Sequence, residues 1–163
     1  SHYPFSPALL KLIRTYENSD QVKAALVNEF YSMARYTVSD TSVLSDLKVV
    51  EKGYPFYGKV QLASGRNFED VLVEGSIIVE QSLLDRTGAT IGESLQIGST
   101  RLAIADIVLQ EPDRPVSFFS FGPRVFIAAA DLEKLDLIKK GSRIGCLSRS
   151  RSFFAFRLPG LGS

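Results

Sequence analysis

The sequence has almost none of the side chains that bind transition metals or form catalytic relays. Its 163 residues include one cysteine, Cys146, and one histidine, His2. A nitrogen- and sulfur-ligated zinc site needs about four ligands, and a Ser-His-Asp or Cys-His relay needs a histidine within the fold. We expect His2, beside Ser1 at the start of the chain, to be a cloning remnant. Both chemistries are therefore all but excluded, and so is an internal disulfide.

Two further absences narrow the function classes. The net charge of +1 argues against a nucleic-acid-binding surface, which is usually markedly basic. No apolar run approaches the ~20 residues that cross a bilayer, and no signal peptide is visible. The single cysteine fits the cytosol as well as the periplasm. With 45% hydrophobic residues, the chain can bury a substantial core.

Glycines and carboxylates offer little catalytic signal. The glycines at 88, 92 and 98 fit neither a P-loop nor a GxGxxG turn, and they indicate caps and hairpin turns. Glu111 and Asp113 flank a proline and could converge on a sugar or a cation in acid–base work. The alternative, which we favour, is a solvated loop held by an ion pair to Arg114 or Arg124.

The most informative stretch is TSVLSDLKVVEKGYPFYGKVQL, residues 41–62. Two strand-like runs, 43–51 and 56–62, flank the corner Lys52-Gly53-Tyr54-Pro55. In the second run, apolar and polar residues alternate with the period of a half-buried strand. We expect a hairpin here, around which the rest of the chain is organised.

Other patterns predict a mixture of strands and short helices. Pro7 opens a helical pattern, Gly88 stands where a helix C-cap is expected, and Asp131 is placed to cap a helix. The predicted elements are a helix from Ser6-Pro7 to Tyr16, a strand over 22–38, a strand over 77–79, a helix over 81–87, a hairpin over 91–109, a strand over 124–129 and a helix over 131–138.

Aromatic residues gather in two short segments. Their side chains could fill the core between a sheet and its helices, or they could form a surface for a lipid or a protein partner. The candidate contact residues, with the proline between them, are Tyr54, Pro55, Phe56, Tyr57, Phe118, Phe119 and Phe121.

Several ordered motifs resemble one family. LKVVEKGYPFYGKVQL is similar to the Leu-Lys-Ala-Val and Tyr-Pro-Leu-Tyr-Gly pattern in the first extracytoplasmic domain of FtsX/MacB-type ABC transporter permeases. VEGSIIV, IGESLQIG, VLQEPDR, PRVFI and KGSRI follow in the order of the landmarks of that domain. The similarity spans roughly residues 29–145, and it is strongest to the permease branch encoded beside lysophospholipase genes.

The resemblance implies an α+β fold with a mixed or antiparallel sheet, two or three short helices and two small lobes. Residues 1–75 and 116–145 would form the first lobe, and residues 76–115 the second. Residues 146–163 do not resemble the family; they would be a divergent strand or vector-derived.

The resemblance also implies a non-catalytic function without a cofactor in this domain. A cytoplasmic partner subunit would hydrolyse ATP, and the permease would relay the motion to a lipid, lipoprotein or peptide cargo on the periplasmic side of the inner membrane. Transmembrane helices, absent from this sequence, would anchor the domain and carry the export signal. Two rivals remain: a stand-alone hydrolase that uses Glu111 and Asp113, and a peptide- or protein-binding adaptor with a free sheet edge.

Overall fold

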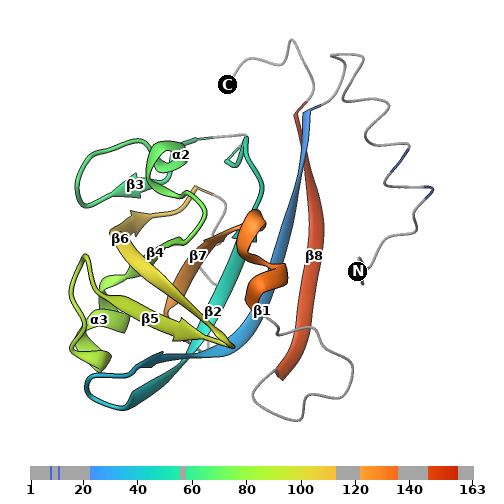
Figure 1. Ribbon diagram of the computed structural model, residues 1–163. Helices are drawn as coiled ribbons and strands as arrows, with labels where there is room; N and C mark the ends of the chain where they lie inside the picture. The colour runs from blue at the N-terminus through green and yellow to red at the C-terminus, as the bar shows by residue number, and fades with distance from the viewer. Residues whose placement is uncertain are drawn as a thin grey trace.

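The computed structural model describes Ala8, Lys11 and residues 23–55, 58–112, 122–135 and 147–157, without the side chains of 23–26 and 147–157. Strands dominate these parts of the chain (Figure 1). The elements, in chain order, are β1 Lys23–Tyr36, β2 Thr41–Val50, β3 Gln61–Leu62, α2 Phe68–Val71, β4 Ser76–Glu80, α3 Gln81–Thr87, β5 Ser94–Ile97, β6 Thr100–Gln110, β7 Arg124–Ala128, the 3₁₀ turns η1 Ala129–Asp131 and η2 Glu133–Leu135, and β8 Leu147–Arg157.

Six of the strands pair in a closed ring. Its order is β1, β2, β7, β4, β6, β5 and back to β1. The pairs β2–β7 and β4–β6 are parallel and the other four are antiparallel. The long β1 pairs with β5 near its end and with β8 along its first half, while β3 adds to β6. The ring leaves two apolar surfaces to bury, one inside and one outside.

The inside of the ring is filled by what we call the interior core. Every ring strand contributes alternate apolar residues to it, and Leu83 and Leu84 of α3 add to it. Such residues are removed from water on all sides, which stabilises the fold by about 25 cal/mol per Å² of apolar area. The strand residues of the interior core are Phe30, Ala34, Tyr36, Val43, Leu47, Val49, Ile77, Val79, Leu95, Ile97, Leu102, Ile104, Val125 and Ile127.

The outside of the ring carries a second group, which we call the outer cluster. It packs residues of opposite parity on β1, β2, β4 and β7, and Val108 of β6, against the chain between β2 and β4. Val108 lies beyond the register shift between β4 and β6, which turns it to the outer side. Tyr54, Phe68 and Phe126 form its aromatic centre, with ring centroids 5.1 to 6.1 Å apart. The other buried members are Val27, Val50, Val60, Leu62, Val71, Ile78 and Val108.

The segment from β4 to β6 folds as the sequence predicts. Helix α3 ends at Gly88, whose φ of 79° is the left-handed C-cap conformation and whose N–H donates to the Leu84 carbonyl. Strands β5 and β6 form the expected antiparallel hairpin. The α+β class with a mixed sheet and short helices is confirmed.

Ring strands come from residues 76–115 as well as from the flanking ranges. The division into two lobes stays a prediction. In the predicted first helix, only Ala8 and Lys11 are described, and both are helical. In the described residues of the segment 146–163, β8 lies antiparallel to β1.

The predicted hairpin over residues 43–62 is wrong. Strand β2 pairs with β1 and β7, whereas β3 has only two residues and pairs with β6. The alternation of Val60 and Leu62 with exposed neighbours is real, but it reflects packing of this segment over the outer cluster. The chain after β2 therefore turns away across the outside of the ring instead of folding back beside β2.

The helix expected from Asp131 onward also differs from the structure. Two short 3₁₀ turns occupy residues 129–135. Asp131 is buried, and its Oδ2 accepts a hydrogen bond from the backbone N–H of Gly75 at 2.7 Å. Its carboxylate thus ties the turn after β7 to the turn before β4 rather than capping a helix.

Candidate functional site

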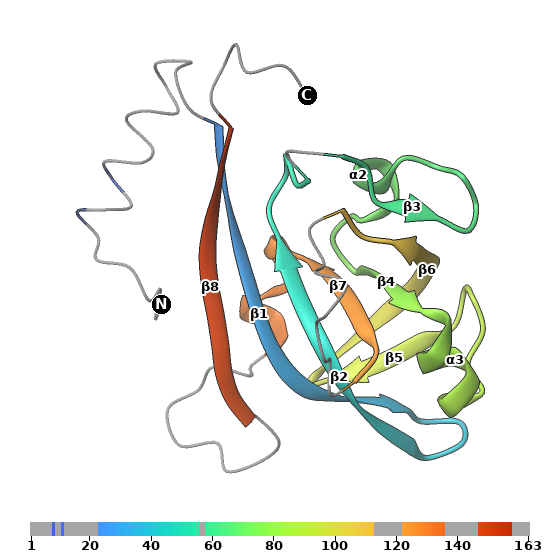
Figure 2. The ribbon, with the colours of Figure 1, turned by 180° about the vertical axis from the view of Figure 1, so that it is seen from behind.

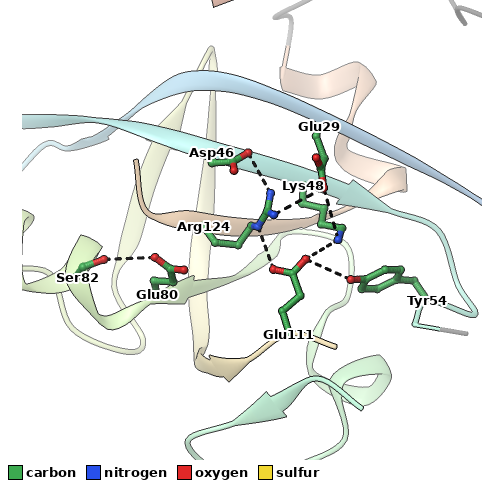
Figure 3. Close-up of polar contacts among 8 residues, drawn as sticks. All are labelled: Glu29, Asp46, Lys48, Tyr54, Glu80, Ser82, Glu111 and Arg124. Atoms are coloured by element: carbon green, nitrogen blue, oxygen red, sulfur yellow. Dashed lines mark hydrogen bonds and ion pairs between the residues drawn. The ribbon is translucent and has the colours of Figure 1, made fainter. Parts of the chain in front are cut away.

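Four buried charged side chains and one half-buried carboxylate, Glu29, lie beside the aromatic centre of the outer cluster (Figure 3). They come from four separate parts of the ring: β1, β2, the residue after β6, and the first residue of β7. We call this group the charge network. Its members are Glu29, Asp46, Lys48, Glu111 and Arg124.

Glu111 is the member that joins the two cations. Its Oε1 lies 2.5 Å from Lys48 Nζ, and its Oε2 accepts a hydrogen bond from Arg124 Nε at 3.1 Å. Tyr54 Oη donates to the same Oε1 at 3.4 Å. The Glu111 side chain is only 3% exposed, so these contacts replace nearly all of its hydration.

Arg124 faces three carboxylates. Besides Glu111, its Nη1 lies 3.0 Å from Asp46 Oδ1 and its Nη2 lies 3.7 Å from Glu29 Oε1. Nη1 has no well-aligned hydrogen-bond acceptor among the described residues, so we treat its contact with Asp46 as ionic. Burial works against the charged guanidinium, but the charges of Glu111, Asp46 and Glu29 outweigh it and raise the pKa of Arg124. Arg124 is therefore a permanent cation.

Lys48 is buried to the same degree. Its side chain is 2% exposed, and its ammonium lies 4.7 Å from the centroid of the Tyr54 ring and 3.5 Å from Glu29 Oε1. An ammonium over an aromatic face is stabilised by the ring quadrupole, by about 2 kcal/mol when desolvated. The outer cluster thus helps to hold the charge that the network needs.

The sheet register explains why these side chains meet. Glu29 is the direct antiparallel partner of Lys48, and Asp46 is the direct parallel partner of Arg124. Since side chains alternate across a strand, Asp46 and Lys48 share the outer side of β2. Leu47 and Val49 then face the interior core.

The close approach of the chain to β2 is enforced locally. Asp46 N–H donates to the Pro123 carbonyl at 2.8 Å, immediately before Arg124. A Cβ at Gly122 would lie 2.0 Å from the Leu44 carbonyl oxygen. Only glycine therefore fits where the chain passes β2 on its way into β7.

The network is suited to tying chain segments together. It combines three carboxylates with two cations, in a place where breaking one contact leaves an uncompensated buried charge. No group of three or more His, Cys, Asp or Glu side chains in the described part of the chain is arranged to hold a metal ion. The charge network can thus connect these chain segments and hold them in a fixed orientation.

The structure separates the residues that the sequence singled out. Glu111 takes the ion-pair role, with Arg124 as one partner, but it is buried rather than solvated. Tyr54 is 3% exposed and packs in the outer cluster, one of the two roles that the sequence left open for it. Pro55 follows it, half-buried, after a cis peptide bond.

The remaining candidates lie outside the described residues. They are Phe56, Tyr57, Asp113, Arg114, Phe118, Phe119 and Phe121. The contact role of the aromatic residues among them stays a prediction.

Glu29, Asp46 and Lys48 received no functional role from the sequence. One signal was present: Lys48 interrupts the apolar run Leu47–Val50. A lysine inside a strand that is buried on both faces needs a buried partner. Its partner Glu111 is 63 residues away in the chain, and no local pattern identifies it.

A smaller polar cluster lies near the turn between β1 and β2. Tyr36 Oη donates to Glu93 Oε1 at 2.7 Å, and the Thr90 N–H donates to Oε2 at 2.8 Å. The hydrogen bond from Tyr36, with those from Thr90, lowers the pKa of Glu93. The same bond raises the pKa of Tyr36. This cluster fixes the α3–β5 loop to β1.

Comparison with known proteins gives this architecture a context. No protein-family model matches the chain. Over 105 residues, 64% of the chain, it is 30% identical to YbbP, an uncharacterized ABC transporter permease of Escherichia coli strain K12. The chain spans 13% of the length of that relative.

Two solved structures share the fold. The periplasmic region of MacB from Actinobacillus actinomycetemcomitans aligns with a TM-score of 0.60 and 13% identity, over 94% of this chain and 66% of that one. The chain has a MacB-like fold. The extracellular domain of YknZ, a noncanonic ABC-type transporter from Gram-positive bacteria, aligns with a TM-score of 0.58 and 14% identity, over 93% and 73% of the two chains. The resemblance to MacB-type permease domains is thus confirmed, while the branch encoded beside lysophospholipase genes stays a prediction.

Proposed function

We propose that the chain is an extracytoplasmic domain of an ABC transporter permease, positioned on the periplasmic side of the inner membrane. The observation that carries the proposal is the MacB-like fold over nearly the whole chain, combined with sequence identity to a permease. Within the described residues, no helix has the length and apolar character needed to cross a bilayer. Membrane attachment would come from transmembrane helices elsewhere in the full protein.

The domain would act mechanically and without a cofactor of its own. A cytoplasmic partner subunit would bind and hydrolyse ATP, and the permease would relay its motion to a lipid, lipoprotein or peptide cargo. Rigid internal connections favour such a relay, and the charge network supplies one across the outside of the ring. The predicted contacts with cargo or a periplasmic protein are Pro55, Phe56 and Tyr57 and the aromatic segment at 118–121, whereas Tyr54 is buried in the outer cluster.

A hydrolase based on Glu111 finds no support in the geometry. Lys48 and Arg124 occupy both of its carboxylate oxygens, and Tyr54 adds a third contact. A general acid or base must instead reach a substrate proton directly or through one water. We therefore keep the non-catalytic proposal.

Labelling of an engineered cysteine tests the location. Val38 is 79% exposed in the turn between β1 and β2, at the end of the domain opposite the start of β1 (Figure 2). In the full-length permease with Cys146→Ser, we expect Val38→Cys to react with a membrane-impermeant maleimide in cells whose outer membrane alone is permeabilised. Reaction only after the inner membrane is broken would refute the proposal.

A buried position provides the matched control. Val79 is fully buried in the interior core, so Val79→Cys should stay unlabelled under the same conditions and react after denaturation. If Val79→Cys is labelled before denaturation, the domain is unfolded in those cells. The Val38→Cys labelling would then be repeated in a variant that is folded.

A further inference from the structure

The charge network connects strands that the sheet itself keeps apart. In the ring, β6 and β2 are separated by β4 and β7. Glu111, the residue after β6, nevertheless contacts Lys48 on β2 and Arg124 at the start of β7 directly. These contacts cross the outer face of the sheet, and Figure 3 shows them converging on one carboxylate.

We infer that Lys48, Glu111 and Arg124 form a diagonal brace that makes the end of β6 move together with β2 and β7. This inference rests on the proposed function, because a mechanical relay needs parts that move as one body. Glu111 is the positioning residue at the centre of the brace. Glu29 and Asp46 hold the two cations from the opposite side.

The polar chemistry of the brace favours rigidity over net stability. Burying two cations with three carboxylates costs desolvation energy, and apolar replacements of buried ion pairs are often neutral or stabilising. Charged hydrogen bonds, however, are short and directional, which apolar contacts are not. A 2.5 Å contact from Lys48 and a 3.1 Å hydrogen bond from Arg124 fix Glu111 on two sides. Sliding of β6 along β4 would break both.

Among the described residues, the pairing of β3 with β6 next to the brace is short. Strand β3 meets β6 through only Gln61–Gln110 and Leu62–Val108, with an irregularity between them. Leu109 is 66% exposed. A Cβ on Gly58 would lie 2.7 Å from Pro112 Cβ, so the chain after Glu111 is also closely packed. The brace is thus a direct polar connection between the exit of β6 and the strands β2 and β7.

Native-state amide hydrogen exchange of the 163-residue chain tests the brace. In the unmodified chain we expect Val108, Leu109 and Gln110 at the end of β6 to be protected together with Lys48 of β2. Glu111→Gln keeps the shape of the side chain and removes its charge. It should accelerate exchange at 108–110 by roughly tenfold or more, beyond the change in global unfolding measured in urea.

Two further variants keep the test decisive. Glu111→Asp retains the charge but shortens the side chain, and it should accelerate exchange at the same residues. It takes the place of Glu111→Gln in the test if that variant does not fold. Glu93→Gln, which removes a hydrogen-bonded carboxylate outside the brace, should leave exchange at 108–110 unchanged relative to global unfolding.

The outcomes separate the brace from the proposed function. Acceleration confined to the end of β6 and the start of β7 supports the brace. A uniform acceleration at all protected amides in both Glu111 variants means a merely stabilising role and overturns it. Neither result depends on where the domain resides, so a failed brace leaves the maleimide labelling of Val38→Cys to decide the location separately.

Discussion

The interior core and the outer cluster each bury one face of most ring strands, but the side chains that do so differ in chemistry. Inside the ring, aliphatic side chains from all six strands meet with few polar groups. Outside, a trio of aromatic rings adjoins four buried charges and the half-buried Glu29. Packing in the interior core holds the ring closed. The aromatic and charged contacts outside the ring determine which chain segment lies over which strands. The proposed mechanical relay would use the second property, because the charge network joins the end of β6 directly to β2 and β7.

Removing Arg124 should have the largest effect and tests the exterior. Arg124→Ala leaves Glu111, Asp46 and Glu29 with Lys48 alone, and we expect it to lower the free energy of unfolding by about 3–5 kcal/mol. Urea denaturation measures the change. Arg86→Ala, at an exposed position on α3, is the control and should change stability by less than about 0.5 kcal/mol. Equal effects of Arg124→Ala and Arg86→Ala would show that the charge network does not stabilise the fold.

The matching test of the interior is Leu47→Ala. Leu47 is fully buried on the inner side of β2, between the outward-facing Asp46 and Lys48. Cavity formation should cost about 2–5 kcal/mol. Leu109→Ala, at a 66% exposed position, is the control. Unlike Glu111→Gln, Leu47→Ala should not accelerate exchange at 108–110 beyond its effect on global unfolding.

A glycine tests how tightly the β7 entry is held against β2. In Gly122→Ala the new Cβ would meet the Leu44 carbonyl, so the backbone must shift, at a cost of about 1–3 kcal/mol. Gly75→Ala adds its Cβ in open space at a φ of 84° and should cost about 1 kcal/mol through backbone conformation alone. If thermal denaturation ranks Gly75→Ala as the more harmful, the close approach at Gly122 is not a constraint.

The smallest expected effect is a pH dependence at Glu93. Its hydrogen bonds, that from Tyr36 foremost, hold its pKa below the ordinary 4.5. The resulting stabilisation is present above that ordinary pKa and is lost as the pH falls through the lower folded-state pKa. Between about pH 5 and about pH 3, the free energy of unfolding should therefore fall less in Glu93→Gln than in the unmodified chain. If urea denaturation shows the same fall in unfolding free energy over this pH range in Glu93→Gln as in the unmodified chain, the assignment is contradicted.

Periodicity and glycine placement predict the local elements of the interior well. The β4–α3–β5–β6 segment follows from alternating apolar residues, a helix of two turns and Gly88. These signals are local: each is set by residues within a few positions of one another. Closure of the ring is not local, since β1 must pair with β2, β5 and β8 at once.

The exterior was predicted less well, for a physical reason. The turn residues around Lys52–Pro55 predict a hairpin, but β2 already pairs with β1 on one edge and with β7 on the other. The pairing of Lys48 with Glu111 depends on the tertiary position of a residue 63 places away. Glu111 itself could be recognised as an ion-pair partner of Arg124, although its burial could not.

Hydrogen exchange of this domain within the full-length protein, bound to the proposed ATP-binding subunit, tests the central claim most directly. We predict that exchange at the end of β6 and at Lys48 of β2 differs between the ATP-bound and nucleotide-free states, and that the two sites change together because Glu111 joins them. If exchange in both segments is identical in every nucleotide state while the complex hydrolyses ATP, the domain does not relay motion and the account is contradicted.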